Sequence, residues 1–94
     1  MKVKNINGTS QNRCKCGSWI NHWENYSGLK ATACSAIGCV NKDLVGAHVQ
    51  KDSIYDSNWY IVPLCNSHNF TNGVINIVYG TKLVSANVAN TCDK

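Results

Sequence analysis

Two short cysteine and histidine motifs constrain this chain more than any other feature of its sequence. Cys34 and Cys39 are separated by four residues that include Gly38, and Cys65 and His68 are separated by two. A tetrahedral zinc ion needs four soft or borderline ligands, which commonly come as two short pairs from a turn and from a helix. The spacing therefore predicts one zinc ion bound by Cys34, Cys39, Cys65 and His68. The alternative is a set of buried free thiols beside a surface histidine.

The length and the cysteine count make such a site expected. A chain of 94 residues forms a single domain with a modest core, so we expect a metal ion or disulfide bonds to help stabilise it. Its six cysteines are compatible with either. The first ten residues contain no apolar run typical of a signal peptide, and no later stretch is long enough to span a membrane. We therefore expect a cytoplasmic protein, in which paired cysteines bind metal more often than they form disulfides.

Three further cysteines leave a second metal site open. Cys14, Cys16 and Cys92 can combine with His22 to give three thiolates and one imidazole that tie the two ends of the chain together. The spacing of Cys14 and Cys16 is tighter than is usual for zinc. The alternative is that these cysteines are unpaired thiols.

The charge of the chain permits contact with nucleic acid without requiring it. The formal net charge is +4, and four basic residues precede the first acidic residue, Glu24. Residues 1–12 are polar, and we expect them to form a flexible arm, with an arm that contacts phosphate groups as the alternative. Residues 1–94 then form one domain with its core at residues 31–73.

Two tryptophans at helical spacing predict a helix before this core. Trp19 and Trp23 are four residues apart, so they share one face of a helix that is expected to end at Gly28. We expect both tryptophans to fill the core or cover the metal site. Stacking on nucleic-acid bases is the alternative.

The remaining patterns predict short strands and complete an α+β domain. Residues 44–50 alternate as a half-buried strand does, and residues 59–64 form a β-branched and aromatic second strand. Pro63 lacks an amide donor, so this strand should end there or lie at an edge of the sheet. Further predicted elements are a short helix that carries Cys65 and His68, and strands at residues 74–78 and 83–88.

Residues 34–69 resemble the treble-clef zinc finger of the HNH nucleases, also called the ββα-metal fold. Gly46-Ala47-His48-Val49 is similar to the histidine strand of that family, and Pro63-Leu64-Cys65-Asn66-Ser67-His68-Asn69 to the start of its helix. The resemblance implies a zinc knuckle, a β-hairpin and a helix. It also implies that His48 removes a proton from water, which then attacks a phosphodiester beside a divalent metal ion. Asn69 matches a second catalytic or metal-binding position.

Two positions depart from the catalytic pattern of the family. Ala47 stands where the family usually has an aspartate or histidine ligand for the catalytic metal, and the orienting asparagine aligns near Tyr60, with Asn58 two residues away. A general base without these partners loses orders of magnitude of rate. We therefore expect His48 to be a packed histidine that bonds a backbone carbonyl or lies near the zinc. A catalytic base and a zinc ligand are the alternatives.

These observations predict a zinc-binding HNH-like module that is not catalytic and that binds a nucleic acid or a protein partner. The second hypothesis is a small metal-dependent endonuclease with His48 as general base and Asn69 beside it. The third is an inhibitor or interaction protein of phage or mobile-element type. In that case exposed aromatic residues such as Tyr55 and Trp59 would dominate binding.

Overall fold

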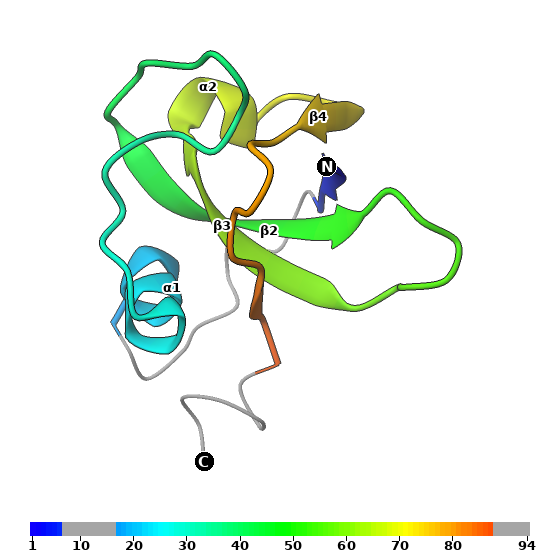
Figure 1. The fold of residues 1–94 in the computed structure, drawn as a ribbon, viewed down its shortest axis with the longest axis horizontal. Helices are drawn as coiled ribbons and strands as arrows, with labels where there is room; N and C mark the ends of the chain where they lie inside the picture. Colours follow the sequence, from blue (N-terminus) through cyan, green and yellow to red (C-terminus); the bar gives the residue numbers. More distant parts are fainter. Residues whose placement is uncertain (7–16, 88–94) are drawn as a thin grey trace.

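The computed structural model describes residues 1–6 and 17–87, which form a five-stranded antiparallel sheet and two short helices. The strands lie in the order β4-β1-β2-β3-β5 (Figure 1). The α+β class predicted from the sequence is confirmed for these residues. In chain order the elements are β1 (Lys2–Asn5), α1 (Trp19–Ser27), β2 (Leu44–Lys51), β3 (Trp59–Cys65), α2 (Asn66–Asn69), β4 (Val74–Asn76) and β5 (Val84–Ser85).

The β2–β3 hairpin is the centre of the fold and separates two hydrophobic cores. Its register pairs Leu44 with Cys65 at one end and Gln50 with Trp59 at the other. Successive residues of a strand face opposite sides, so Ala47 contributes to the larger core while its neighbour His48 faces the other way. The buried residues of the larger core are Val3, Cys34, Ala36, Ala47, Val49, Val62, Leu64, Cys65, Ile75 and Ile77.

Helix α1 begins and ends where its capping residues predict. The side chain of Ser18 accepts a hydrogen bond of 3.2 Å from the amide of Asn21, which satisfies one of the free N–H groups of the first turn. Gly28 follows the helix in the left-handed region with a φ of 75°, a conformation that glycine adopts without strain. The predicted helix and its end at Gly28 are therefore confirmed.

The smaller core lies between α1 and the hairpin. Trp23 is 5 % exposed and packs with Ile61, while Trp19 packs at the edge of this cluster. A Cβ atom at Gly46 would lie 2.3 Å from the carbonyl carbon of Trp19. Any residue other than glycine at this position would therefore collide with the backbone of α1. Figure 1 shows α1 and α2 on opposite sides of the hairpin. The tryptophans thus fill a core, and this core is not the one that carries the predicted metal ligands.

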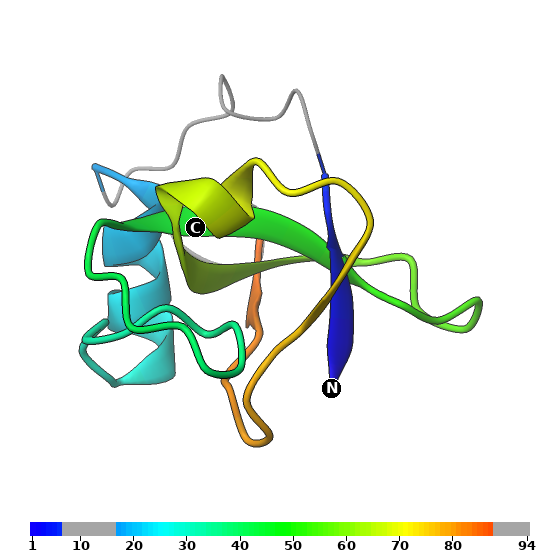
Figure 2. The same cartoon turned by 90° about the horizontal axis from the view of Figure 1, so that it is seen from above.

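Residues 2–5 correct the prediction of a flexible arm. Lys2–Asn5 forms strand β1 between β4 and β2, and Val3 is fully buried. Backbone hydrogen bonds to both neighbouring strands satisfy the N–H and C=O groups of β1, so the strand forms although most of its side chains are polar. Figures 1 and 2 show β1 on the other side of the molecule from α1. Residues 7–12 of the predicted arm lie outside the described residues.

Pro63 corrects a second prediction, because β3 neither ends there nor lies at the edge of the sheet. The neighbouring strand β5 pairs only with Tyr60 and Ile61, so it does not reach the proline. The amide and carbonyl of one residue in an antiparallel strand point to the same side. The carbonyl of Pro63 accepts a hydrogen bond of 2.9 Å from the amide of Ser35. The missing N–H therefore faces a loop, where it removes no bond from the sheet.

Both predicted C-terminal strands are present but shorter than expected. β4 ends at Asn76, after which Ile77 forms only an isolated bridge with Ala36. β5 contains two residues, Val84 and Ser85. Residue 88, the end of the second predicted strand, lies outside the described part of the chain.

Candidate metal centre

The first predicted pair of ligands, Cys34 and Cys39, is carried by a turn that packs against the sheet. The bridge between Ala36 and Ile77 attaches this turn to the chain that follows β4. The amide of Cys39 donates to the carbonyl of Ala36 at 3.1 Å, and Gly38 supplies a φ of 78°. The turn therefore presents two sulfur atoms from a defined backbone.

The second pair lies where β3 meets α2. Cys65 ends the strand and precedes the single helical turn that contains His68, so a spacing of three brings both side chains to one side. The amide of Asn66 donates to the Asp43 carboxylate at 3.3 Å, and the Asn5 side chain donates to the carbonyl of His68 at 2.7 Å. The turn is thus held by β1 and by the segment before β2.

The structure brings all four predicted ligands together. Three sulfur atoms and one imidazole nitrogen lie within 4.8 Å of one another. Cys39 Sγ is 3.8 Å from Cys65 Sγ, and His68 Nδ1 is 3.3 Å from Cys65 Sγ and 3.6 Å from Cys34 Sγ. Zinc–sulfur bonds of about 2.3 Å and zinc–nitrogen bonds of about 2.0 Å give tetrahedral edges of roughly 3.8 Å between sulfurs and roughly 3.5 Å between sulfur and nitrogen. The four side chains therefore fit one tetrahedral metal ion such as zinc.

Hydrogen-bond donors also point at the sulfur atoms. The backbone amide of Cys65 donates to Cys34 Sγ at 3.3 Å, and the carboxamide of Asn41 donates to Cys65 Sγ at 3.5 Å. Such donors stabilise the negative charge of a thiolate and orient it toward a metal ion. Asn41 was not among the predicted site residues. Its position two residues after Cys39 is the only sign of its role in the sequence.

The buried thiols differ in their affinity for protons. Burial raises the pKa of the Cys34 thiol to about 11. Burial also raises the pKa of Cys65, but hydrogen bonds from the His68 backbone and the Asn41 side chain outweigh it and lower this pKa to about 6. The surroundings thus favour the thiolate form of Cys65 and the protonated form of Cys34, and a bound metal ion would favour the thiolate form of both.

The geometry argues against two alternatives to a metal site at these residues, namely disulfide bonds and free thiols beside a surface histidine. Cys34, Cys39 and Cys65, the cysteines of the described residues, carry free thiols and form no disulfide bond. His68 is only partly exposed, and its Nδ1 faces the sulfur atoms of Cys34 and Cys65. It is therefore not an isolated surface histidine.

His48 lies on the face of β2 opposite the candidate metal centre. Its ring packs edge-on against Trp19, with 4.5 Å between ring centroids, and against Trp59 at 6.3 Å. The residue is 6 % exposed, and among residues 1–6 and 17–87 its buried Nε2 has no hydrogen-bond partner. Burial, with a smaller contribution from His22, lowers the pKa of His48 to about 4. His48 is thus a packed histidine. Within the described residues, the expected backbone hydrogen bond and the position near the centre formed by Cys34, Cys39, Cys65 and His68 are wrong, and His48 is not a ligand of that centre.

The catalytic arrangement implied by the HNH resemblance is not assembled. His48 faces α1, whereas Asn69 belongs to α2, which lies on the other side of the hairpin (Figure 1). Tyr60, which aligns with the orienting asparagine, donates its hydroxyl to the Asp56 carboxylate at 2.6 Å. Ala47 is 2 % exposed within the larger core. The described residues therefore bring no orienting group or catalytic metal ligand to His48.

His22 is the one member of the predicted second metal site that the structure describes. Cys14, Cys16 and Cys92 lie outside the described residues. His22 is fully buried, and its Nε2 is 2.8 Å from the carbonyl oxygen of Ser85. This nitrogen therefore joins α1 to β5.

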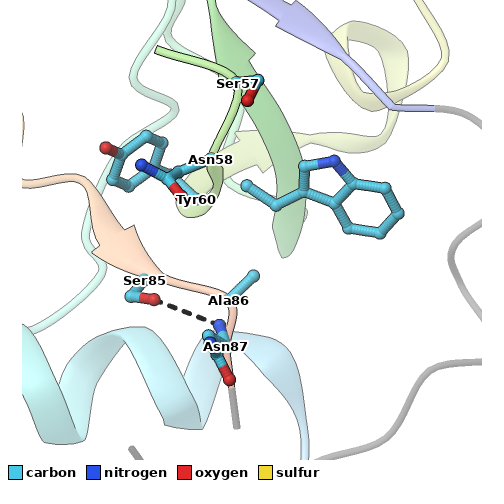
Figure 3. A pocket seen from close by; sticks show the side chains of 7 residues that line it. Ser57, Asn58, Tyr60, Ser85, Ala86 and Asn87 are labelled. Atoms are coloured by element: carbon cyan, nitrogen blue, oxygen red, sulfur yellow. Dashed lines mark hydrogen bonds between the residues drawn. The ribbon is translucent and has the colours of Figure 1, made fainter. Parts of the chain in front are cut away.

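A pocket of about 570 Å³ lies between the start of β3 and the end of β5 (Figure 3). Asn58, the other position considered for an orienting asparagine, lines this pocket, and its amide donates to Asp56 at 2.9 Å. None of the lining residues supplies a carboxylate, imidazole or thiol, so the pocket adds no metal ligand or strong base. They are Ser57, Asn58, Trp59, Tyr60, Ser85, Ala86 and Asn87.

Comparison of the chain with protein-family models, curated proteins and solved structures finds no match. The HNH-like family thus stays a prediction that rests on the sequence resemblance. Within residues 1–6 and 17–87, no helix has both the length and the apolar character needed to cross a bilayer.

Proposed function

We propose that this chain is a zinc-binding module in which one metal centre stabilises the fold and the surface binds a partner. The observation that supports this role is the convergence of Cys34, Cys39, Cys65 and His68, whose ligand atoms lie within 4.8 Å of one another. Structural zinc sites use four protein ligands, whereas catalytic zinc sites keep one position for water or substrate. A complete set of four protein ligands therefore favours a structural ion.

The order of the parts supports an HNH-like treble clef. A turn with two cysteines, the β2–β3 hairpin and a helical turn with a histidine follow one another as the resemblance of residues 34–69 implies. Ala47 has no side-chain group that can bind a catalytic metal, and it is buried in the larger core. The proposed module therefore shares the layout of the family without its catalysis.

A binding role is supported by the surface of the molecule. The net charge of +4 favours polyanionic partners such as nucleic acids. At the tip of the hairpin, Ile54 and Tyr55 are 91 % and 92 % exposed, which is typical of residues that contact a protein partner. Both classes of partner remain compatible with the module as a whole.

Hydrolysis of a phosphodiester by His48 has less support, because the imidazole is enclosed by aromatic rings. Supercoiled plasmid incubated with the protein and Mg²⁺, Mn²⁺ or Ni²⁺ tests this directly, with His48→Ala as the matched variant. We expect equal background in both samples. Cleavage by the unmodified protein that disappears in His48→Ala would overturn the non-catalytic role.

Native mass spectrometry tests the zinc centre. In a variant with Cys14, Cys16 and Cys92 changed to serine, we expect one zinc ion per chain. Adding Cys65→Ser should remove it, whereas the control Ser67→Ala, in the same helical turn, should retain it. A triple variant that carries no zinc would reject the proposed function. The same count on the unmodified chain gives two ions if the second site exists.

A further inference from the structure

The surface beside the candidate metal centre contains a pocket with positive charge. The pocket has a volume of about 230 Å³ and lies between residues 29–35 and 78–82. Lys30 and Lys82 line it from these two segments, together with the hydroxyl-bearing residues Thr32, Ser35 and Thr81. No lining residue carries a carboxylate. The hydroxyl of Thr81 already donates to the carbonyl of Val78 at 2.6 Å, so the groups that the pocket offers to a ligand are the two ammonium groups and the hydroxyls of Thr32 and Ser35.

A third ammonium group lies at the rim. Lys42 Nζ donates to the carbonyl of Thr32, a lining residue, at 3.1 Å. Lys51, near the hairpin tip, is instead paired with the Asp56 carboxylate at 3.5 Å. Lys30 and Lys82 have no such ion pair within the described residues. The charges are thus separated, with neutralised lysines near the hairpin tip and free ammonium groups at the pocket.

The negative groups close to the pocket do not cancel this charge. The Glu24 carboxylate accepts a hydrogen bond of 2.8 Å from the amide of Ala31 and is the acid nearest along the chain to the first wall. A zinc ion with three thiolates and one imidazole carries a net charge of about −1. Asp43, the residue after Lys42, accepts a hydrogen bond from the amide of Asn66 beside the metal centre, so the positive charge available to a ligand rests on Lys30 and Lys82, which form no ion pair within the described residues.

Hydrogen bonds hold the walls of the pocket in place. The amide of Val78 donates to the carbonyl of Ser35, and the amide of Ser35 donates to the carbonyl of Pro63, both at 2.9 Å. The Trp23 indole donates to the carbonyl of Lys82 at 2.9 Å. These contacts tie both walls to β3 and α1. The backbone of both walls is therefore ordered before any ligand arrives, which reduces the entropy lost on binding.

We propose that this pocket binds a backbone phosphate of a nucleic acid. Phosphate oxygens accept hydrogen bonds from lysine and hydroxyl donors, and such contacts set the register of a protein on nucleic acid. Lys30 and Lys82 are exposed, so the pocket opens to solvent and a polymer can pass across it. This inference rests on the proposed function, because Cys34 both lines the pocket and belongs to the metal centre.

Fluorescence anisotropy with the zinc-loaded protein tests the pocket, using a labelled DNA duplex and a labelled single-stranded RNA. The test variant is Lys30→Gln/Lys82→Gln, and Lys2→Gln/Lys51→Gln is a control with the same loss of charge elsewhere. For whichever nucleic acid binds, we expect the test variant to raise Kd roughly tenfold at about 0.1 M salt. Its slope of log Kd against log salt should be shallower by about 2. The control should change Kd less than about twofold.

A titration with inorganic phosphate, followed by amide NMR, provides the second measurement. Chemical-shift changes should concentrate at residues 31–35 and 78–82 and disappear in Lys30→Gln/Lys82→Gln. Equal nucleic-acid binding by the two double variants overturns the inference, as does phosphate binding by a protein that binds neither nucleic acid. Zinc is counted in each sample. If the protein retains zinc but fails these tests, only the phosphate-binding role of the pocket is rejected. If the protein binds no zinc, the proposed function is rejected as well.

Discussion

Each face of the β2–β3 hairpin encloses a histidine, and the two histidines have different surroundings. On one face, Nδ1 of His68 lies 3.3 and 3.6 Å from two sulfur atoms. On the other face, Nε2 of His48 is buried among aromatic rings and has no hydrogen-bond partner in the part of the chain that the structure describes. The first arrangement suits a metal ion, and the second suits only a neutral ring. The contrast shows that the groups around a buried imidazole, rather than its burial, indicate what it can do.

The two faces should also differ in what stabilises them. On the metal-centre face, the cysteine turn and the end of β3 pack into the larger core through Cys34, Ala36 and Cys65, so two of the candidate metal ligands are also core residues. The α1 face is held by Trp23 and Ile61 and by the helix caps. Loss of a metal ligand should therefore affect the whole domain, whereas changes on the α1 face should weaken the protein and leave the zinc bound.

The largest expected effect is the loss of the metal ion. Structural zinc contributes on the order of 10 kcal/mol to the folding of small domains, so Cys65→Ser should remove the cooperative thermal transition. A chelator added to the unmodified protein should have the same effect, which circular dichroism can follow. Chelator-treated protein that melts at the temperature of the untreated protein would contradict a stabilising role for the metal.

The second-largest expected effect concerns the smaller core. Trp23→Ala removes a buried indole and should lower the free energy of unfolding by about 3 to 5 kcal/mol, measured in urea with zinc present. Ile61→Val is a milder change in the same core and should lower it by about 1 kcal/mol. In Ile61→Val the zinc content measured by mass should be unchanged. If it falls as it does in Cys65→Ser, the two faces are not independent.

The buried imidazole of His48 makes stability depend on pH. Its pKa is about 4 in the folded state, against 6.5 for a free histidine, so the unfolded state binds more protons between these values. The contribution of neutral His48 to the free energy of unfolding is complete above about pH 6.5. As the pH falls toward 4, this free energy decreases by on the order of 2 to 3 kcal/mol.

Urea unfolding of the zinc-loaded protein across this pH range measures the effect of His48. The zinc ligands also take up protons at low pH, so the informative quantity is the difference from His48→Gln, which retains those ligands. The variant should show a shallower fall in stability. Identical pH profiles would show that His48 is not buried in the neutral form.

The smallest expected effect concerns the N-terminus of α1. Ser18→Ala removes the acceptor for the amide of Asn21 and should lower the free energy of unfolding by about 1 kcal/mol. The control Ser57→Ala changes an exposed serine outside the helices and should be within about 0.5 kcal/mol of the unmodified protein. Equal losses in the two variants would mean that the cap does not stabilise α1.

The candidate ligands were predictable from the sequence because zinc restricts which residues can share a site and how they can be spaced. Cys34, Cys39, Cys65 and His68 carried that restriction in the order of the chain, and the structure places them together. Helix α1 was predictable for a similar reason, since Gly28 is a local stop signal. The helix end and each pair of ligands depended on residues within a few positions of one another, whereas joining the two pairs depended on the fixed number of ligands that zinc needs.

Features that depend on distant pairing were not predictable. Strand β1 has one fully buried residue, Val3, and forms because β2 and β4 pair with it from far along the chain. Pro63 is accommodated because β5 is short and a loop bonds to its carbonyl. Alternation placed His48 opposite Ala47, but only the packing of the cysteine turn and of α1 decides which face holds the metal centre.

X-ray absorption at the zinc edge tests the central claim most directly. The sample is the zinc-loaded variant in which Cys14, Cys16 and Cys92 are changed to serine, so that one predicted centre remains. We expect three sulfur neighbours at about 2.3 Å and one nitrogen neighbour at about 2.0 Å, with no bound water. A coordination shell of oxygen and nitrogen atoms, or one with fewer than three sulfurs, would contradict a zinc centre formed by Cys34, Cys39, Cys65 and His68.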